Sequence, residues 1–328
     1  MPLTTALKGS AFLAFEEKRD WLVAELCTCF GADREELVFY GDLVYWQNAP
    51  AEKIKPFWCS TVYFEPFTVE FQSVSEAASA LKQIQRNWAP YQFTLFRRAA
   101  LIQDKLPYIN LKPRNFPYSV PQSEIGAWTL TDEHTLFASA KTSSFLPCGK
   151  IQFVEDHENP PSRAYLKIQE ALVHFQAFFG DFPQKGQHCF EAGACPGGWT
   201  YVLVQLGCSV FAVDRSPLAD SLMQNPNVKF LAHDAFTLKC EDIEPVDWVL
   251  SDVICYPERL LEWVKLWLAR PQVPNMICTI KMQGETNWET IKAFAELPDS
   301  KVIHLNYNKH ELTWLHKGHK ATDSFSAG

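Results

Sequence analysis

The pattern of apolar and polar positions changes near the middle of the chain. From about residue 10 to 150, short aromatic and β-branched runs are separated by Pro and Gly, and two helical patterns lie among them. This mixture is typical of an α+β domain. The predicted strands are Leu37–Tyr40, Leu43–Trp46, Thr61–Phe64, Thr68–Phe71 and Thr135–Ala138, and the predicted helices are Lys18–Phe30 and Val74–Trp88.

The second half begins after a proline-rich break at Asn159-Pro160-Pro161-Ser162. Beyond it, apolar runs alternate regularly with amphipathic stretches, which predicts an α/β domain with a doubly wound, mostly parallel sheet. We therefore predict two domains, residues 1–155 and 156–328. Strands are expected at His188–Gly193, Ser209–Asp214, Val228–Leu231, Val246–Ser251, Asn275–Lys281, Lys301–Asn306 and Leu312–His316, and helices at Ser162–Phe179, Gly198–Leu206, Pro217–Gln224, Pro257–Ala269 and Asn287–Glu296.

A glycine-rich turn follows the first strand of this second half. Ligands of doubly wound sheets bind beyond the carboxyl ends of the strands, so this turn is a site candidate. Gly193 would allow a sharp turn, and Gly197 and Gly198 remove Cβ atoms where a backbone must approach a ligand. The alternative is a plain glycine-rich turn between strand and helix. The spacing also departs from the G-x-G-x-x-G of dinucleotide sites, which argues against an NAD-dependent oxidoreductase.

Three further strands of this half end at or near an aspartate, namely Asp214, Asp234 and Asp252. Any one of them alone could cap a helix. Asp214 lies 21 residues after Gly193, where an acidic side chain would accept both hydroxyls of a ribose. Together with the glycine turn, the three favour a nucleoside ligand without phosphate, most plausibly S-adenosylmethionine. The predicted cofactor residues are Glu191, Gly193, Ala194, Cys195, Pro196, Gly197, Gly198, Trp199, Asp214, Asp234 and Asp252.

Two of these segments resemble a known family. The loop Glu191–Trp199 is similar to the D-x-G-A-x-P-G-G-W/F loop of the FtsJ-type ribose 2′-O-methyltransferases, although Glu191 replaces the usual aspartate. Pro161–Glu170 is similar to the P-S-R-A-x-x-K-L-x-E helix that precedes that loop. Further matches at Gly193–Tyr201 and Ser221–Met223 resemble a bacterial member that methylates a cytidine of large-subunit ribosomal RNA. The resemblance covers roughly residues 159–316. It implies a Rossmann-like methyltransferase domain, and the first half resembles that member's THUMP-containing region only in element order.

The family's catalytic tetrad is Lys-Asp-Lys-Glu. The resemblance places it at Lys167, Asp252, Lys281 and Glu311. Asp252 and Lys281 also each end an apolar strand at the ligand edge, where a charged side chain has no packing role. We expect Lys281 to deprotonate or orient a ribose 2′-hydroxyl, Asp252 and Lys167 to position it, and Glu311 to organise Lys281. Burial and the nearby Lys167 are expected to lower the pKa of Lys281. For each residue singly, a surface ion pair is the alternative.

Charge changes this picture only locally. The chain has 30 basic against 38 acidic residues, a net charge of −8, which excludes binding of polyanions by bulk charge. Between Lys82 and Arg114, however, the sequence contains seven basic residues and a single acidic residue, Asp104, with aromatic residues interleaved. This predicts an RNA-binding surface, with a solvated basic face over an aromatic core as the alternative. The candidate RNA-binding residues are Arg86, Arg97, Arg98, Lys105, Lys112 and Arg114.

Ten cysteines are spread singly, and the N-terminal stretch Ala11–Phe15 is too short for a signal or a membrane span. We therefore expect a cytoplasmic protein with reduced cysteines, no membrane partner and no metal. The leading hypothesis is a ribosomal RNA 2′-O-methyltransferase. The alternatives are the same fold acting on another RNA or on a base nitrogen, and a non-catalytic RNA-binding protein. Ser251-Asp252-Val253-Ile254 lacks the Asn/Asp-Pro-Pro-Tyr/Phe motif expected for base nitrogens, and the intact tetrad favours catalysis.

Overall fold

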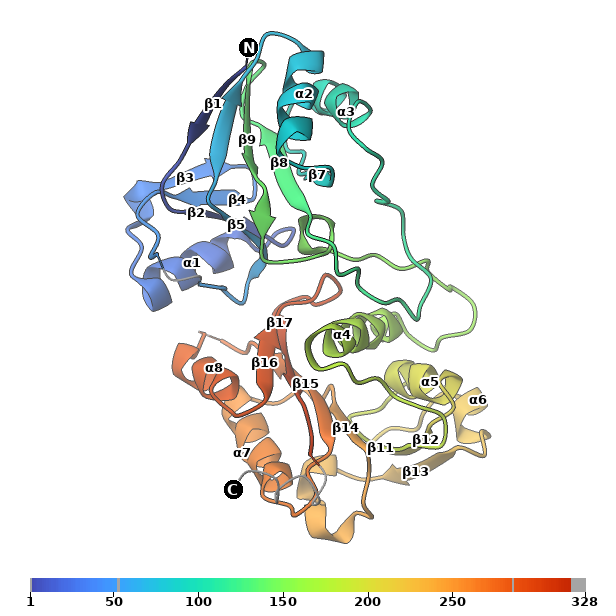
Figure 1. Cartoon of the computed structure of the whole chain (residues 1–328). Coiled ribbons are helices and arrows are strands. Elements are labelled where there is room, and N and C mark those ends of the chain that lie inside the picture. The colour runs from blue at the N-terminus through green and yellow to red at the C-terminus, as the bar shows by residue number, and fades with distance from the viewer. Residues whose placement is uncertain (1, 52–53, 285, 320–328) are drawn as a thin grey trace, which may run out of the picture. The chain divides into compact units, whose positions relative to one another are not determined.

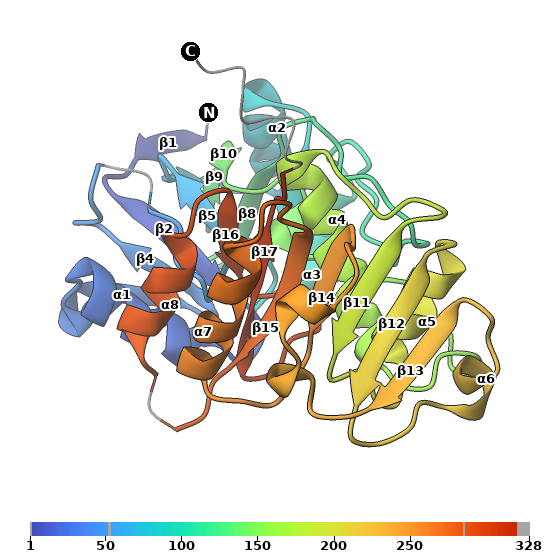
Figure 2. The same cartoon turned by 90° about the horizontal axis from the view of Figure 1, so that it is seen from below.

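The computed structural model of the chain describes residues 2–51, 54–284 and 286–319 (Figures 1 and 2). The chain divides into two compact units. The first comprises Met1–Arg114 and Val120–Gln152, and the second comprises Asn115–Ser119 and Phe153–Gly328. The short segment Asn115–Ser119 joins the second unit because the ring of Phe116 packs 5.9 Å from the rings of both Phe153 and Phe182.

The first unit contains two five-stranded sheets. One has the order β1 (Leu3–Ala6), β6 (Phe67–Glu70), β9 (Thr135–Ser139), β8 (Gly126–Leu130) and β7 (Trp88–Pro90). The other has the order β10 (Lys141–Thr142), β5 (Cys59–Phe64), β2 (Ser10–Ala14), β4 (Leu43–Trp46) and β3 (Leu37–Tyr40). The helices are α1 (Arg19–Phe30), α2 (Val74–Ile84) and α3 (Phe96–Gln103).

The sequence pattern predicted only part of the secondary structure of this unit. The helix expected to run to Trp88 ends at Ile84, and Trp88 instead begins β7. The Trp88 side chain is fully buried, and its indole N–H donates to the carbonyl of Leu81 at 3.0 Å, which ties the strand back to the helix. Strands β2 and β8 were not predicted, because both of their faces are buried and they show no alternation of polar and apolar residues. Strand β1 and helix α3 were also missed.

The second unit confirms the predicted mostly parallel, doubly wound sheet. Its seven strands lie in the order β13-β12-β11-β14-β15-β17-β16. The first five are paired in parallel, and β17 runs antiparallel to both of its neighbours, β15 and β16. In Figures 1 and 2, α4 and α5 cover one face and α7 and α8 the other. The strands are β11 (His188–Ala192), β12 (Ser209–Asp214), β13 (Val228–Ala232), β14 (Trp248–Ser251), β15 (Asn275–Lys281), β16 (Ser300–Ile303) and β17 (Glu311–His316), and the helices are α4 (Ala164–Phe179), α5 (Gly198–Gln205), α6 (Asp220–Met223), α7 (Pro257–Leu268) and α8 (Trp288–Ala295).

Several elements of the second unit are shorter than expected. The helix predicted over Pro217–Gln224 is a single turn, α6. The strand predicted over Lys301–Asn306 ends at Ile303, and residues 304–310 form a loop before β17. This loop ends directly before Glu311 and therefore lies next to one of the predicted catalytic residues.

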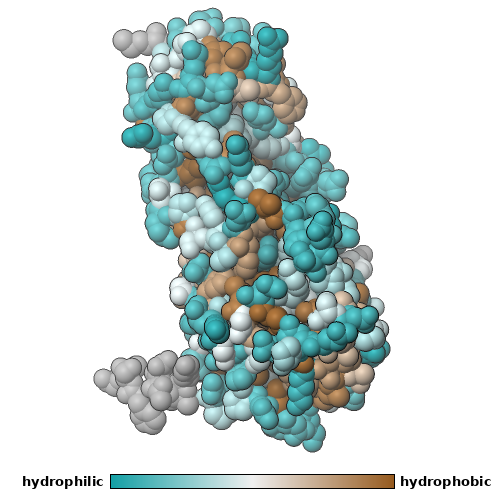
Figure 3. Space-filling model, turned by 90° about the vertical axis from the view of Figure 1, so that its right-hand side faces the viewer, coloured by the Kyte–Doolittle hydropathy of each residue, from teal (hydrophilic) through white to brown (hydrophobic). Residues whose placement is uncertain are grey.

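On the face drawn in Figure 3, polar side chains predominate and apolar ones come to the surface in patches between them. Within the described residues, the structure contains no helix of sufficient length and apolarity to span a membrane. Among the same residues, no group of His, Cys, Asp or Glu side chains is arranged to hold a metal ion.

Candidate active site

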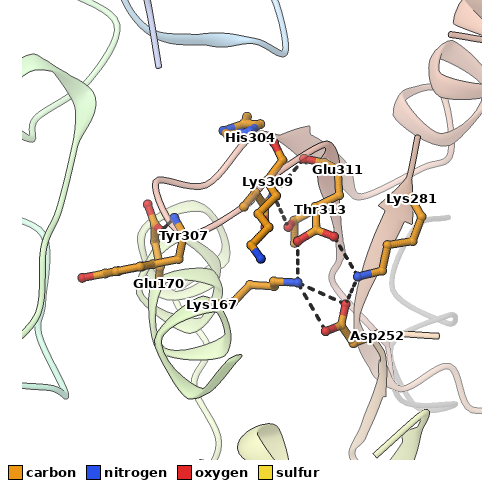
Figure 4. A network of polar contacts seen from close by, with 10 residues as sticks. Lys167, Glu170, Asp252, Lys281, His304, Tyr307, Lys309, Glu311 and Thr313 are labelled. Carbon is orange, nitrogen blue, oxygen red and sulfur yellow. Dashed lines mark hydrogen bonds and ion pairs between the residues drawn. The ribbon is translucent and has the colours of Figure 1, made fainter. Parts of the chain in front are cut away.

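Four charged side chains from four different elements meet at one edge of the second unit's sheet (Figure 4). Lys167 of α4 lies with its Nζ 2.5 Å from Glu311 Oε1 and 3.2 Å from Asp252 Oδ1. Lys281 Nζ lies 2.6 Å from Asp252 Oδ1 and 2.7 Å from Glu311 Oε2. Each carboxylate therefore contacts both ammonium groups. The structure brings together all four residues of the predicted tetrad, which we call the charged cluster.

The topology of the sheet explains how the cluster forms. Strands β15 and β17 are antiparallel, and their register pairs Lys281 directly with Glu311, so both side chains project from the same face. Asp252 follows β14, the parallel neighbour of β15, and its backbone N–H donates to the carbonyl of Ala192 at 3.2 Å. Lys167 reaches the cluster from α4. The ion pairs thus span residues far apart in the sequence.

The cluster is mostly shielded from water. The exposed fraction of the side chain is 9% for Lys167 and Glu311, 16% for Lys281 and 21% for Asp252. Burial alone would raise the pKa of Glu311, but the ammonium groups of Lys167 and Lys281 bring it below its usual value. Asp252 is the most exposed of the four and is therefore the member most accessible to a ligand.

The expected lowering of the Lys281 pKa is wrong. Burial does act to lower the pKa of Lys281, but the charges of Asp252 and Glu311, and the hydrogen bonds to both, outweigh it and raise the pKa above its usual value. The reason is distance, since both carboxylates touch Lys281 directly. Lys281 is consequently an ammonium ion at neutral pH in this structure.

The glycine turn between β11 and α5 packs closely against its neighbours. Gly193 and Gly197 have φ of +76° and +110°, backbone angles that residues other than glycine rarely adopt. A Cβ on Gly193 would lie 2.7 Å from Val253 Cγ2, and one on Gly197 would lie 2.2 Å from Leu222 Cδ1. Of the other turn residues, Cys195 and Pro196 are exposed, whereas Ala194, Gly198 and Trp199 are buried. Glycine is therefore required at both positions for the turn to keep this path.

The three aspartates differ in their surroundings. Asp214 joins the turn to the end of β12, accepting the backbone N–H of Cys195 and of Ser216, each at 3.0 Å. Asp234 accepts the N–H of Phe236 as a cap and pairs with Arg215 at 2.7 Å and Arg259 at 3.6 Å. Asp252 belongs to the charged cluster. Asp214 therefore lies closest to its predicted setting, while the carboxylate of Asp234 is already shared by two arginines.

Glu191 lies beneath the turn, with 2% of its surface exposed. Its Oε2 accepts the hydroxyl of Thr200 at 2.6 Å. Burial raises the pKa of Glu191 to about 8, the Thr200 bond opposes this rise, and the charges of Asp252 and Asp214 add to it. Glu191 is therefore largely protonated at neutral pH and acts as a neutral partner of Thr200.

This protonation predicts a pH-dependent stability. Between pH 4.5, the usual pKa, and about 8, the folded chain keeps a proton that the unfolded chain loses, so this group's contribution to stability falls as the pH rises. Glu191→Gln removes that loss. We expect the variant's free energy of unfolding, relative to wild type, to increase across this window by up to about 1.4 kcal/mol per pH unit. Urea unfolding at several pH values measures it, with Glu262→Gln on the exposed face of α7 as control. A difference independent of pH would contradict the protonated state.

The candidate RNA-binding residues of the first unit have unequal settings. Arg86, Arg97 and Lys105 are exposed, but the guanidinium of Arg98 lies 5.5 Å over the ring of Phe71 and its Nε is buried. Of the interleaved aromatic residues, Trp88 belongs to the core, whereas Phe96 and Tyr108 are 59% and 79% exposed. Lys112 and Arg114 line a cavity of about 180 Å³ together with Lys150, which was not predicted.

Comparison with known proteins finds similarity between the second unit and a family of methyltransferases. Residues 160–310 match the model of the FtsJ-like methyltransferases. Curated relatives named ribosomal RNA large subunit methyltransferase M match from Thauera aminoaromatica, at 30% identity over 55% of this chain and 55% of the relative, and from Aggregatibacter aphrophilus (strain NJ8700), at 28% over 50% and 49%. The relative from Hahella chejuensis (strain KCTC 2396) is 29% identical over 72% of this chain and 57% of its own length. The chain thus spans about half the length of the curated relatives it matches. Residues 160–310 of this chain are therefore similar to the FtsJ-like methyltransferases.

Proposed function

We propose that this chain is an S-adenosylmethionine-dependent RNA ribose 2′-O-methyltransferase whose substrate is large-subunit ribosomal RNA. The observation that carries the proposal is the charged cluster of Lys167, Asp252, Lys281 and Glu311, next to the glycine turn at the carboxyl edge of the sheet. The family of residues 160–310 supports methyl transfer, and the names of the relatives support the RNA. Cytidine as the target rests on the sequence resemblance alone, and we propose the cytoplasm as the location.

The residues at the turn fit S-adenosylmethionine. The Asp214 carboxylate, at the end of β12 beside the turn, is proposed to accept the ribose hydroxyls, and Gly193 and Gly197 let the turn pack against Val253 and Leu222. The hydroxyl of Ser162, near Gly198 at the start of α5, is a buried polar group without a hydrogen-bond partner among the described residues. When bound, the cofactor supplies a methyl group already activated on a sulfonium.

In the proposed reaction, the chain must orient a ribose hydroxyl and accept its proton. The ammonium of Lys281 would donate a hydrogen bond to the 2′-oxygen and orient it. The proton of the 2′-hydroxyl would pass to the Asp252 carboxylate as the oxygen accepts the methyl group that the bound cofactor would supply. Lys167 and Glu311 keep Asp252 and Lys281 in place through the contacts described above. This assigns orientation, not deprotonation, to Lys281.

The pH dependence of the reaction separates these two roles. The pKa of Lys281 lies above its usual value of 10.5, because Asp252 and Glu311 overcome the effect of burial. If neutral Lys281 were the base, turnover would rise about tenfold per pH unit throughout the neutral range. If Asp252 accepts the proton, we expect single-turnover rates to be nearly constant between about pH 6.5 and 9. A steep, continuous rise would overturn the assignment to Asp252.

The cofactor assignment has a direct binding test. Asp214→Ala is expected to weaken binding of S-adenosylmethionine by more than about tenfold, because hydrogen bonds to a charged group contribute about 1.5–3 kcal/mol. Isothermal titration calorimetry measures the affinity. Asp220→Ala is the matched control, because Asp220 is an exposed aspartate on nearby α6. Equal affinities of wild type and Asp214→Ala would contradict the ribose contact.

For the first unit we propose RNA binding through a THUMP-like domain, with Arg86, Arg97, Arg98, Lys105, Lys112 and Arg114 as contacts. The exposed basic residues and the exposed aromatic rings of Phe96 and Tyr108 support this role. Arg98 contributes at most one face of its guanidinium, because Phe71 covers the other.

The deciding experiment is transfer of labelled methyl groups to ribosomal RNA from cells that lack this protein, followed by nuclease mapping. We expect label in a 2′-O-methylnucleotide, most plausibly 2′-O-methylcytidine, of the large-subunit RNA. Label in another RNA would keep the reaction and replace the substrate. Cofactor binding without transfer to any RNA would favour the non-catalytic alternative.

A further inference from the structure

The loop formed by residues 304–310 presents a lysine beside the charged cluster. Lys309 lies two residues before Glu311 and is exposed. Figure 4 shows its side chain extending with its ammonium end toward Lys167 and Glu311. Among the residues that the structure describes, no side chain forms a hydrogen bond or an ion pair with this ammonium group. Lys309 belongs to neither the tetrad nor the candidate cofactor residues.

A buried carboxylate holds this loop in place. Glu170, one turn after Lys167 on α4, is fully buried, and its two oxygens accept the backbone N–H groups of Asn306 at 2.8 Å and Tyr307 at 3.0 Å. The next residue, Asn308, donates from Nδ2 to the carbonyl of Glu311 and to Thr313 Oγ1, both at 3.1 Å. Hydrogen bonds therefore fix each of the three residues before Lys309, and the two bonds to the Glu170 carboxylate are charge-assisted. The backbone from which Lys309 projects is preorganised.

The net charge of the cluster indicates a role for Lys309. Two ammonium and two carboxylate groups leave the cluster with no net charge, so it offers no surplus attraction for an anionic substrate. In RNA, the carbon that carries the 2′-hydroxyl is bonded to the carbon that carries the 3′-phosphodiester. A 2′-hydroxyl at Asp252 therefore necessarily brings a phosphate to within a few ångströms of the cluster. A flexible ammonium with no protein partner is well suited to contact that phosphate.

We propose that Lys309 binds the phosphodiester on the 3′ side of the methylated nucleotide, and that Glu170 is the positioning residue that fixes the loop for this contact. The proposal rests on the proposed function and adds a phosphate subsite to it. The same helix, α4, then serves both parts of the site, because Lys167 contacts the cluster and Glu170 contacts the loop.

The first test compares Lys309→Ala with Lys301→Ala, a matched exposed lysine near the opposite end of β16. For Lys309→Ala we expect the KM for RNA to rise about five- to tenfold, with unchanged affinity for S-adenosylmethionine. The slope of log affinity against log salt should fall by about 0.7–0.9, the value for one lost phosphate contact. Lys309→Arg should restore most of the affinity, and Lys301→Ala should behave as wild type. An unchanged salt slope in Lys309→Ala would overturn the proposal.

The second test changes one phosphate of the RNA and compares wild type with Lys309→Ala. An RNA with a neutral methylphosphonate on the 3′ side of the mapped nucleotide should bind wild type five- to tenfold more weakly than unmodified RNA. Lys309→Ala should not distinguish the two RNAs. If wild type does not distinguish them either, Lys309 has no such contact. If wild type methylates no RNA at all, the proposed function fails first, so the two failures are separable.

The role of Glu170 is tested by combining a Glu170 variant with Lys309→Ala in a double-mutant cycle. Glu170→Gln keeps the side chain's shape but replaces one of its two acceptor oxygens by a donor group. We expect it to raise the KM for RNA, and we expect the addition of Lys309→Ala to cause little further loss. A general structural defect would instead add to the effect of Lys309→Ala, and it would also weaken cofactor binding. Either result would remove Glu170 from the proposal.

Discussion

Lys281→Ala is expected to lower the rate of methyl transfer about a hundred- to thousandfold, while the variant still binds S-adenosylmethionine with wild-type affinity. Lys281 contacts Asp252 and Glu311 at 2.6 and 2.7 Å, and its ammonium is the group that would orient the 2′-oxygen. Its removal takes away a contact at the reacting atom and leaves both carboxylates paired with Lys167 alone. Removal of one positioned hydrogen-bond donor at a reacting oxygen typically lowers the rate by this factor. Single-turnover transfer of labelled methyl groups measures the rate, and calorimetry measures the affinity.

The matched control is Lys265→Ala, which removes a lysine from the exposed face of α7. This variant should keep the wild-type rate. If Lys281→Ala kept most of the activity, the charged cluster would be an ion-pair network that supports the fold, and the proposed reaction would need another site. Loss of cofactor affinity in Lys281→Ala would show that the change had disturbed the glycine turn as well, and that variant would then not measure the role of Lys281.

The second large effect is on stability. Glu311→Leu is expected to lower the free energy of unfolding by about 3–5 kcal/mol, because it leaves two mostly buried ammonium groups with one carboxylate. The double variant Glu311→Leu/Lys167→Met, which removes one charge of each sign, should recover much of that loss. It should remain inactive, because the positioning contacts of Lys281 and Asp252 are not restored. Urea unfolding measures the stability.

The stability effect of Glu311 should also depend on pH. Burial raises the pKa of Glu311, but the two lysines bring it below 4.5, so its stabilising contribution is present above pH 4.5 and is lost as the pH falls through the lowered value. The gap between wild type and Glu311→Leu should therefore narrow at acidic pH. Glu296→Leu, at an exposed position just after α8, is the control and should show no such gap. A gap of equal size at all pH values would indicate lost packing and not lost ion pairs.

The sequence identified the second unit well because most of its strands are near-continuous apolar runs that alternate regularly with helical patterns. Ser209–Asp214 and Asn275–Lys281 were predicted to the residue, since a continuous apolar run bounded by polar residues marks such a strand. The first unit was harder to predict. Its strands β2 and β8 are buried on both faces, but they do not alternate regularly with helices, and no parallel pattern marked them.

The sequence alone determined the residue types of the site and their places at strand ends: the glycine turn, Asp214, Asp252 and Lys281. Only the tertiary structure decided how they act on one another. The antiparallel register of β15 and β17 sets Lys281 against Glu311. The contacts of Lys281 with Asp252 and Glu311 raise its pKa, whereas burial and the nearby Lys167 suggested a lowered one. The same holds for Glu170, which lies 136 residues from Asn306 in the sequence and contacts it in the fold. Electrostatic energies and hydrogen bonds depend on distances of a few ångströms, and those distances are set by the packing of distant segments.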